Sequence, residues 1–141
     1  MRFIADGRTL SRDDAWRNMA LILGRWQLRG YGLWAVKHRE SRKLIGRIGF
    51  WNPEGWPGFE LGWLLGRSYW GKGYATEGAR RAMEYGFREL GRKRIISLIR
   101  PDNGKSVRVA ERLGKRYRGT VEVMGAEAMV YGIEKSEWSG I

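Results

Sequence analysis

The chain contains no cysteine and one histidine among its 141 residues. Disulfide bonds, thiolate metal ligands and cysteine nucleophiles are therefore excluded, and one imidazole cannot form a histidine cluster. We expect no metal in the protein. Long apolar runs are also missing, because the longest run near the start covers only residues 19–23, which is too short for a signal peptide or a membrane span. These absences predict a cytoplasmic protein that has no membrane partner.

Glycine is what the chain has in excess. Its 21 glycines are about double the usual share of roughly 7%, and hydrophobic residues make up 43% of the sequence. We therefore expect a globular fold that contains several glycine-dependent turns. A length of 141 residues predicts a single domain, residues 1–141.

Positive charge is the second excess. The chain has 27 Lys and Arg residues against 15 Asp and Glu residues, a net charge of +12, and most of the surplus, Lys115 included, lies in residues 78–118. Such a charge predicts an anionic partner: a nucleic acid, an acidic protein surface or a phosphorylated cofactor. Charge alone does not choose among them, but no recognisable nucleic-acid motif is present.

The hydrophobic pattern predicts the order helix, three strands, helix, strand, helix and two strands. Helices are expected at residues 12–28, 76–90 and 104–113, and strands at 31–37, 43–51, 59–65, 95–99, 117–123 and 128–134. This order predicts an α+β fold of three layers, in which a mixed, mostly antiparallel twisted sheet carries helices on both faces.

The sharpest local feature is the glycine-rich segment 71–73, between an expected strand and a helix that begins near Thr76. Glycines let the main chain approach a ligand closely, and a helix start offers free N–H groups and a positive dipole end. We therefore expect this segment to bind a diphosphate. A nucleotide-binding P-loop needs Ser or Thr where Gly73 stands, and a dinucleotide fingerprint needs glycine where Thr76 stands. Both of these phosphate motifs therefore fail.

Residues 70–79 read W-G-K-G-Y-A-T-E-G-A, which resembles the pyrophosphate-binding motif R/Q-x-x-G-x-G/A of the GNAT superfamily of acyl-CoA-dependent N-acyltransferases. Gly73 and Ala75 match the motif, while Trp70 replaces Arg or Gln, a replacement familiar in the branch that resembles ribosomal-protein N-terminal acetyltransferases. Two further blocks, E-L-G-W-L-L at 60–65 and P-D-N-G-K-S at 101–106 with its continuation to Gly114, fit the same branch. The resemblance thus covers residues 60–114.

The resemblance implies an N-acetyltransferase that moves the acetyl group of acetyl-CoA directly to a primary amine, on a protein N-terminus or a small molecule. The strand that ends at residue 65 would splay from the strand at 95–99 and expose main-chain groups to the pantetheine arm, while the glycine-rich segment would hold the diphosphate. The cofactor-binding residues implied in this way are Trp63, Leu64, Leu65, Trp70, Gly71, Lys72, Gly73, Tyr74, Ala75, Thr76, Asn103 and Ser106.

Two residues are expected to carry the catalysis. The resemblance places Ser106, at the start of the helix 104–113, to hydrogen-bond the CoA sulfur. Many relatives have a Tyr acid where Ala110 stands, so we expect Ser106 to serve here as a donor rather than a strong acid. Glu60 is the candidate base or water-orienting residue, since its strand leads into the site; the alternative is a solvated carboxylate on an edge strand. Asn103 either orients the pantetheine amide or simply caps a helix, and both interpretations stay open.

Further residues are expected to contact a ligand or to lie at the surface. Arg108 or Arg112 would anchor the 3′-phosphate of CoA, and Trp51 and Trp56 are the aromatic residues best placed to contact a substrate. His38 lies in an expected polar turn and is assigned to the surface.

The start of the chain departs from the resemblance. Residues 1–4 align with the segment just before the second helix of the family, so the family's first strand and helix are expected to be absent. Either the start codon is assigned late or the protein is truncated, or the missing strand is supplied by a second copy or left out. A bare sheet edge pairs readily with another chain, and we therefore predict a homodimer or a poorly soluble monomer. Two other functions stay open: a basic RNA- or ribosome-binding module, and a CoA-binding GNAT fragment with impaired catalysis.

Overall fold

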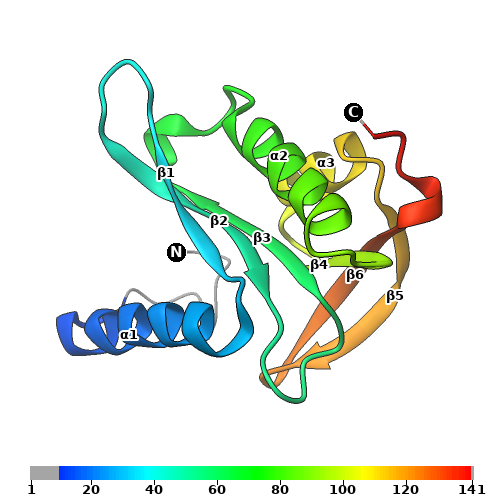
Figure 1. Ribbon diagram of the computed structural model, residues 1–141, viewed down its shortest axis with the longest axis horizontal. Helices are drawn as coiled ribbons and strands as arrows, with labels where there is room; N and C mark the ends of the chain where they lie inside the picture. Colours follow the sequence, from blue (N-terminus) through cyan, green and yellow to red (C-terminus); the bar gives the residue numbers. More distant parts are fainter. Residues whose placement is uncertain (1–9, 141) are drawn as a thin grey trace.

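The computed structural model describes residues 10–140, and it has the order of elements that the sequence predicts (Figure 1). The elements are α1 (Arg12–Arg29), β1 (Leu33–Lys37), β2 (Leu44–Trp51), β3 (Glu60–Leu65), the 3-10 helix η1 (Arg67–Tyr69), α2 (Tyr74–Arg88), β4 (Arg94–Ile99), α3 (Gly104–Arg112), β5 (Arg116–Val123), β6 (Ala126–Glu134) and the 3-10 helix η2 (Lys135–Glu137). The predicted ends differ from the observed ones by a few residues. Residues 1–4, on which the expectation about the missing elements rests, lie outside the described part.

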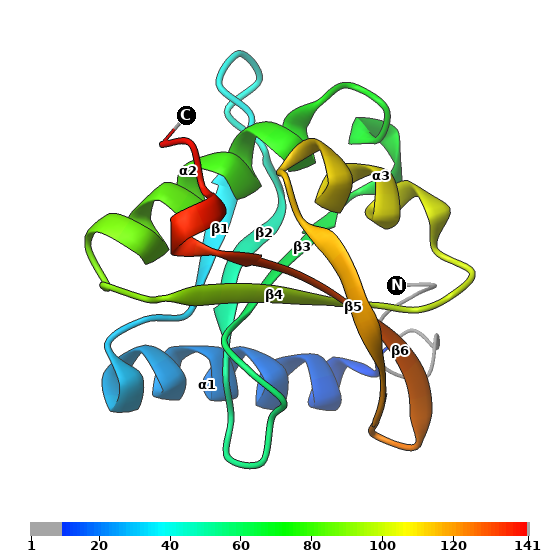
Figure 2. The ribbon, with the colours of Figure 1, turned by 90° about the vertical axis from the view of Figure 1, so that its right-hand side faces the viewer.

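The six described strands form one sheet in the order β1-β2-β3-β4-β6-β5. Neighbouring strands run antiparallel except β3 and β4, which are parallel. Helices α2 and α3 lie on one face of the twisted sheet and α1 lies on the other (Figures 1 and 2). The predicted three-layer α+β fold with a mixed, mostly antiparallel sheet is confirmed.

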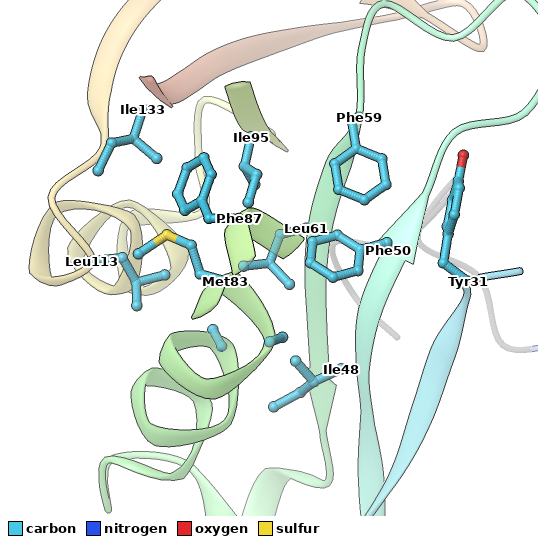
Figure 3. Close-up of a cluster of buried hydrophobic side chains, with 12 residues drawn as sticks. Tyr31, Ile48, Phe50, Phe59, Leu61, Met83, Phe87, Ile95, Leu113 and Ile133 are labelled. Carbon is cyan, nitrogen blue, oxygen red and sulfur yellow. The ribbon is translucent and has the colours of Figure 1, made fainter. Parts of the chain in front are cut away.

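The main core lies between the sheet and α2 (Figure 3). Its largest fully buried side chains are Phe50, Phe87, Leu61, Met83 and Ile95. Each such side chain stabilises the fold by about 1.5–3 kcal/mol relative to exposure. The helix approaches the sheet closely: a Cβ atom on Gly86 would lie 2.8 Å from the Phe50 ring. This packing fixes the N-terminus of α2 relative to the end of β3.

Helix α1 is attached in a different way. None of its residues is buried. The Ser11 side chain caps the start of the helix by accepting from the Asp14 N–H. The indole of Trp26 donates to the Leu33 carbonyl at 2.9 Å and packs edge-on against Trp34. Polar and aromatic contacts, rather than burial, hold this helix to the sheet.

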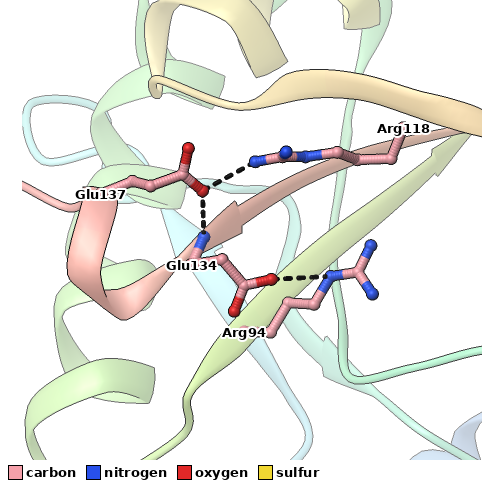
Figure 4. A network of polar contacts seen from close by, with 4 residues as sticks. All are labelled: Arg94, Arg118, Glu134 and Glu137. Atoms are coloured by element: carbon pink, nitrogen blue, oxygen red, sulfur yellow. Dashed lines mark hydrogen bonds and ion pairs between the residues drawn. The ribbon is translucent and has the colours of Figure 1, made fainter.

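At the opposite end of the chain, a polar network closes the sheet (Figure 4). Arg118 of β5 pairs with Glu137 at 2.7 Å, and Glu137 also accepts from the Glu134 N–H. Arg94 of β4 pairs with Glu134 at 3.4 Å. The network ties η2 to β4, β5 and β6.

Candidate functional site

The two parallel strands separate almost as soon as they meet. β3 and β4 pair at one position, Glu60 opposite Ile96. Beyond it, side chains replace the ladder: the Ser97 hydroxyl donates to the Leu61 carbonyl at 2.6 Å, and the Leu98 N–H donates to Glu60 Oε2 at 3.0 Å. The predicted splay between the two strands is therefore present, and the opening between them is called the β3–β4 gap below.

The alternation of β3 directs one main-chain unit into this gap. The carbonyls of Phe59 and Leu61 both face β4, so the N–H and C=O of Trp63, two residues further, face the same side. Leu64 pairs with Arg47 of β2 and is directed away from the gap. The Leu65 carbonyl accepts from the Trp70 indole at 2.8 Å. Of the three β3 residues named from the sequence, Trp63 offers its main chain to the gap.

The turn that follows β3 depends on glycine. Gly71 and Gly73 have φ values of 74° and 82°, a left-handed conformation that costs other residues energy. No atom lies within 4 Å of a Cβ built at either position, so conformation rather than crowding requires glycine there. The Trp70 indole anchors this turn to the end of β3. This is the contact that Trp70 makes at the motif position where Arg or Gln is usual.

The N-terminus of α2 is open to an anion. Its N-cap is Gly73, which has no capping side chain, so the N–H groups of the first turn have no helical partner. The hydroxyl of Thr76 is buried but has no hydrogen-bond partner, and buried polar atoms in this state are rare. A pocket of about 540 Å³ opens beside it, lined by Gly73, Thr76, Glu77, Arg80, Arg81, Glu84 and Arg112.

The start of α3 is capped instead. Asn103 Oδ1 accepts from the Ser106 N–H at 3.3 Å, which is the capping role left open from the sequence. Ser106 Oγ accepts from the Trp63 indole at 3.2 Å, so its own O–H stays available as a donor. Ala110, where many relatives place an acid, is fully buried.

Glu60 is partly buried. It lies on β3, an inner strand, which corrects the alternative of an edge-strand carboxylate. Its two oxygens accept from the Trp56 indole and the Leu98 N–H, each at 3.0 Å. Burial raises the pKa of Glu60, and the two hydrogen bonds oppose this rise. Trp51, the other aromatic residue expected to meet a substrate, is covered by the Arg25 guanidinium at 3.3 Å.

His38 follows β1 in the turn where the sequence places it, and it is partly exposed. Its Nε2 lies 3.1 Å from the hydroxyl of Tyr74, while Nδ1 lies 2.8 Å from Ser41 Oγ. The imidazole links the β1–β2 turn to the first residue of α2. The partner is 36 residues away in sequence, so no local pattern indicates it.

Lys115 is the site residue that sequence reasoning missed. It is 2% exposed, its Nζ donates to Ser97 Oγ at 2.5 Å, and it lies 5.6 Å from the centre of the Trp63 ring. Burial lowers the pKa of Lys115 to about 7, against the negative charge of Glu60, which raises it. The overlooked signal is its position directly after the helix-ending Gly114, where an apolar residue normally packs back onto the helix.

Between residues 10 and 140 no group of three or more His, Asp or Glu side chains is arranged to hold a metal ion. None of the helices in that part is long and apolar enough to cross a membrane.

Comparison with known proteins identifies the family of this chain. The model of the acetyltransferase (GNAT) domain matches residues 1–116. The Bacillus subtilis protein YkkB is 35% identical over 107 residues, which cover 73% of this chain and 62% of that protein. The uncharacterized N-acetyltransferase YnaD of the same organism is 41% identical over 81 residues, which cover 57% of this chain and 48% of that protein. The chain thus spans about half to six tenths of these relatives.

A solved structure supports the same family. The crystal structure of an acetyltransferase from Agrobacterium tumefaciens strain C58 superposes with a TM-score of 0.82 and 30% identity, over 93% of this chain and 77% of that one. The resemblance carried by residues 60–114 is confirmed over a larger part of the sequence. The chain belongs to the GNAT acetyltransferase domain family.

Proposed function

We propose that the protein transfers the acetyl group of acetyl-CoA to a primary amine. The observation that carries the proposal is the β3–β4 gap, which opens beside an uncapped helix N-terminus. A sheet interrupted in this way offers unpaired main-chain groups to an extended ligand, and the helix start offers N–H groups to its phosphates.

The residues fit coenzyme A along its length. The diphosphate would lie against the main chain of residues 71–76, where the unpartnered Thr76 hydroxyl supplies one more donor. Lys72 lies beside the same turn, 5.9 Å from the Tyr69 ring. Arg112, which lines the neighbouring pocket, would meet the 3′-phosphate. The main chain of Trp63 and the amide of Asn103 would bind the pantetheine arm.

The transfer itself needs two side chains. The amine nitrogen attacks the thioester carbon, the new C–N bond replaces the C–S bond, and the sulfur leaves with the electron pair. Ser106 donates a hydrogen bond from its free O–H to the departing sulfur, and Glu60 receives the proton that the amine loses. When bound, acetyl-CoA supplies the activated acetyl group, so no covalent enzyme intermediate is needed.

The acceptor would enter from the α1 side of the sheet. Leu61 packs in the core under α2, so its neighbour Glu60 points to the opposite face. Cofactor and acceptor therefore reach the gap from opposite faces. The acceptor would be a protein N-terminus or a small-molecule amine. The absence of cysteine is compatible with the cytoplasm as the compartment.

We also propose a homodimer. Within residues 10–140, no strand pairs with the outer edge of β1, and α1 exposes Trp16 and Leu23 to 69% each. Such edges and apolar side chains favour self-association. Sedimentation equilibrium gives the test, and a monomer at all concentrations would contradict this part.

Release of free thiol from acetyl-CoA in the presence of a panel of amines tests the function, together with calorimetric titration of CoA. We expect CoA binding and amine-dependent thiol release. Gly73→Val should weaken CoA binding at least tenfold, because a β-branched residue disfavours the left-handed conformation. Gly125→Val is the matched control, since Gly125 has a φ of 77° in the β5–β6 turn. A protein that neither binds CoA nor releases thiol would refute the proposal.

A further inference from the structure

Lys105 reaches across the open end of the β3–β4 gap. The two strands are parallel and pair at one position near their starts, so the segments that follow them, 66–73 after β3 and 100–106 after β4, lie together at the end where the strands have separated. Lys105 belongs to the second segment, and its Nζ lies 4.8 Å from the centre of the Trp70 ring in the first. This contact joins the glycine-rich turn to the start of α3.

The Trp70 ring that receives this cation is fixed in place. Its indole N–H donates to the Leu65 carbonyl at 2.8 Å, which holds the ring at the end of β3. The guanidinium of Arg67 lies 5.8 Å from the centre of the same ring. An aromatic face attracts a nearby cation, but such a contact is weak where it is exposed to solvent. Trp70 and Lys105 are both exposed, so Lys105 can exchange this contact for a stronger one.

Lys105 has no acidic partner in the described part of the chain. It takes part in none of the ion pairs found there, the nearby Asp102 pairs with Arg100, and the segment 66–76 contains no Asp or Glu. Lys105 also stands in the first turn of α3, which has no acidic residue, and the dipole of a helix disfavours a cation at that end. The charge therefore opposes the helix that carries it, and an anion bound nearby would remove this cost.

The opposite side of the same opening offers donors to an anion. The main chain turns through left-handed conformations at Gly71 and Gly73, α2 begins without a capping side chain, and the buried Thr76 hydroxyl has no hydrogen-bond partner. Trp70 directly precedes this turn, so its ring keeps Lys105 beside these donors. Because a lysine amine carries three donors on a flexible stem, it can turn from the ring to an anion bound at the helix start.

We propose that Lys105 binds the diphosphate of coenzyme A and thereby closes the open end of the β3–β4 gap behind the pantetheine arm. This inference rests on the proposed function. In the free protein the amine lies on the Trp70 ring. With the cofactor bound, the amine donates charge-assisted hydrogen bonds to the phosphate oxygens, which are stronger than the contact that it gives up. The starts of α2 and α3 then hold the diphosphate from two sides.

The contact in the free protein has a spectroscopic test. In protein labelled with ¹⁵N tryptophan, the indole N–H signal that disappears in Trp70→Phe belongs to Trp70. Lys105→Gln should shift this signal, because the cation leaves the ring. Lys93→Gln removes the same charge at an exposed position before β4 and should leave the signal in place. A Trp70 signal that Lys105→Gln does not move would mean that the ring does not hold the amine, and would contradict the inference.

Two ligands separate the phosphates that Lys105 could meet. Dephospho-CoA keeps the diphosphate but lacks the 3′-phosphate, which the proposed function assigns to Arg112. In calorimetric titrations, Lys105→Gln should weaken the binding of CoA and of dephospho-CoA by the same factor, about tenfold, because both ligands offer the diphosphate. Arg112→Gln should weaken the binding of CoA alone. Lys93→Gln is the matched control and should leave both affinities unchanged.

The outcomes of these titrations are distinct. Lys105 is exposed, so its substitution leaves the core intact and the affinities report on the ligand contact. A loss confined to CoA would assign Lys105 to the 3′-phosphate and overturn the inference. Unchanged affinities for both ligands would overturn it as well, while the proposed function would stand. If the wild-type protein binds neither ligand, the proposed function fails and the inference fails with it.

Discussion

The two longest helices lie on opposite faces of one sheet and are attached in opposite ways. α2 buries six residues, Thr76, Ala79, Ala82, Met83, Gly86 and Phe87, whereas α1 buries none. The helix that carries the proposed cofactor contacts is thus fixed by the core. The helix on the proposed acceptor side is held by a few contacts of Asn18, Arg25 and Trp26.

This difference shows where the site is rigid and where it is adaptable. Regions with few buried apolar contacts open locally at a lower free energy than the core. A cofactor that is the same in every turnover suits the rigid face. An acceptor side with a loosely attached helix can adjust to the shape of the amine. On the rigid face, one residue should be held at a larger free-energy cost than the others.

Lys115 should be that residue. Burial lowers its pKa from 10.5 to about 7, so between these values the unfolded chain binds one more proton than the folded protein, and the free energy of unfolding rises with pH. Below pH 7 the full penalty applies, which corresponds to about 5 kcal/mol as an order of magnitude. Denaturant titrations at pH 6, 8 and 10 should show Lys115→Met more stable than wild type at pH 6, with a difference that shrinks as pH rises. Parallel pH profiles would contradict this.

Core truncation should separate the two helices. Phe87→Ala on α2 removes a fully buried ring and should lower the free energy of unfolding by about 3–5 kcal/mol. Leu23→Ala on α1, where the side chain is 69% exposed, should change it by about 0.5 kcal/mol or less. Urea titration of both variants measures the contrast. Equal losses would mean that α1 is covered in solution, as a dimer through this face would require.

Asn103 allows its two interpretations to be separated. Asn103→Ala removes the α3 cap and should cost about 1 kcal/mol of stability. Asn103→Asp keeps an acceptor for the Ser106 N–H but loses the amide donor, so its stability should stay near that of wild type. Calorimetric titration with CoA then decides: a several-fold weaker binding in Asn103→Asp supports contact with pantetheine, and unchanged binding leaves Asn103 as a cap alone.

Local patterns gave most of the fold. The apolar face of α2 and the glycine that follows it are visible in the sequence, and so is the turn of β5 and β6. The sequence pattern does not indicate that α2 begins at Tyr74 rather than Thr76. The N-cap of this helix is Gly73, which has a left-handed conformation and no capping side chain. The β5–β6 turn is shorter than predicted, since Met124 and Gly125 both adopt positive φ and Ala126 already belongs to β6.

The site was predictable where its residues form one segment and not where distant segments meet. The glycine-rich turn and the block containing Ser106 are local motifs. The burial of Lys115 depends on how β3 and β4 diverge, and its sequence context is that of a basic, solvated stretch. His38 finds its partner across 36 residues. The absence of buried residues in α1 also depends on tertiary contacts. The composition of this segment alone is typical of a helix that packs against a core.

The attachment of α1 to the sheet can be weakened at Trp26. Trp26→Phe keeps an aromatic ring against Trp34 but removes the hydrogen bond to the Leu33 carbonyl, which should cost about 0.5–1.5 kcal/mol. If α1 is a separate, weakly held unit, hydrogen exchange should accelerate in α1 while α2 amides keep their wild-type protection. The Trp26 ring lies close to the main chain of the sheet, because a Cβ atom built on Gly32 would lie 2.7 Å from the indole nitrogen. Acceleration that spreads equally to α2 would mean that the two faces unfold together and that the acceptor side is as rigid as the cofactor side.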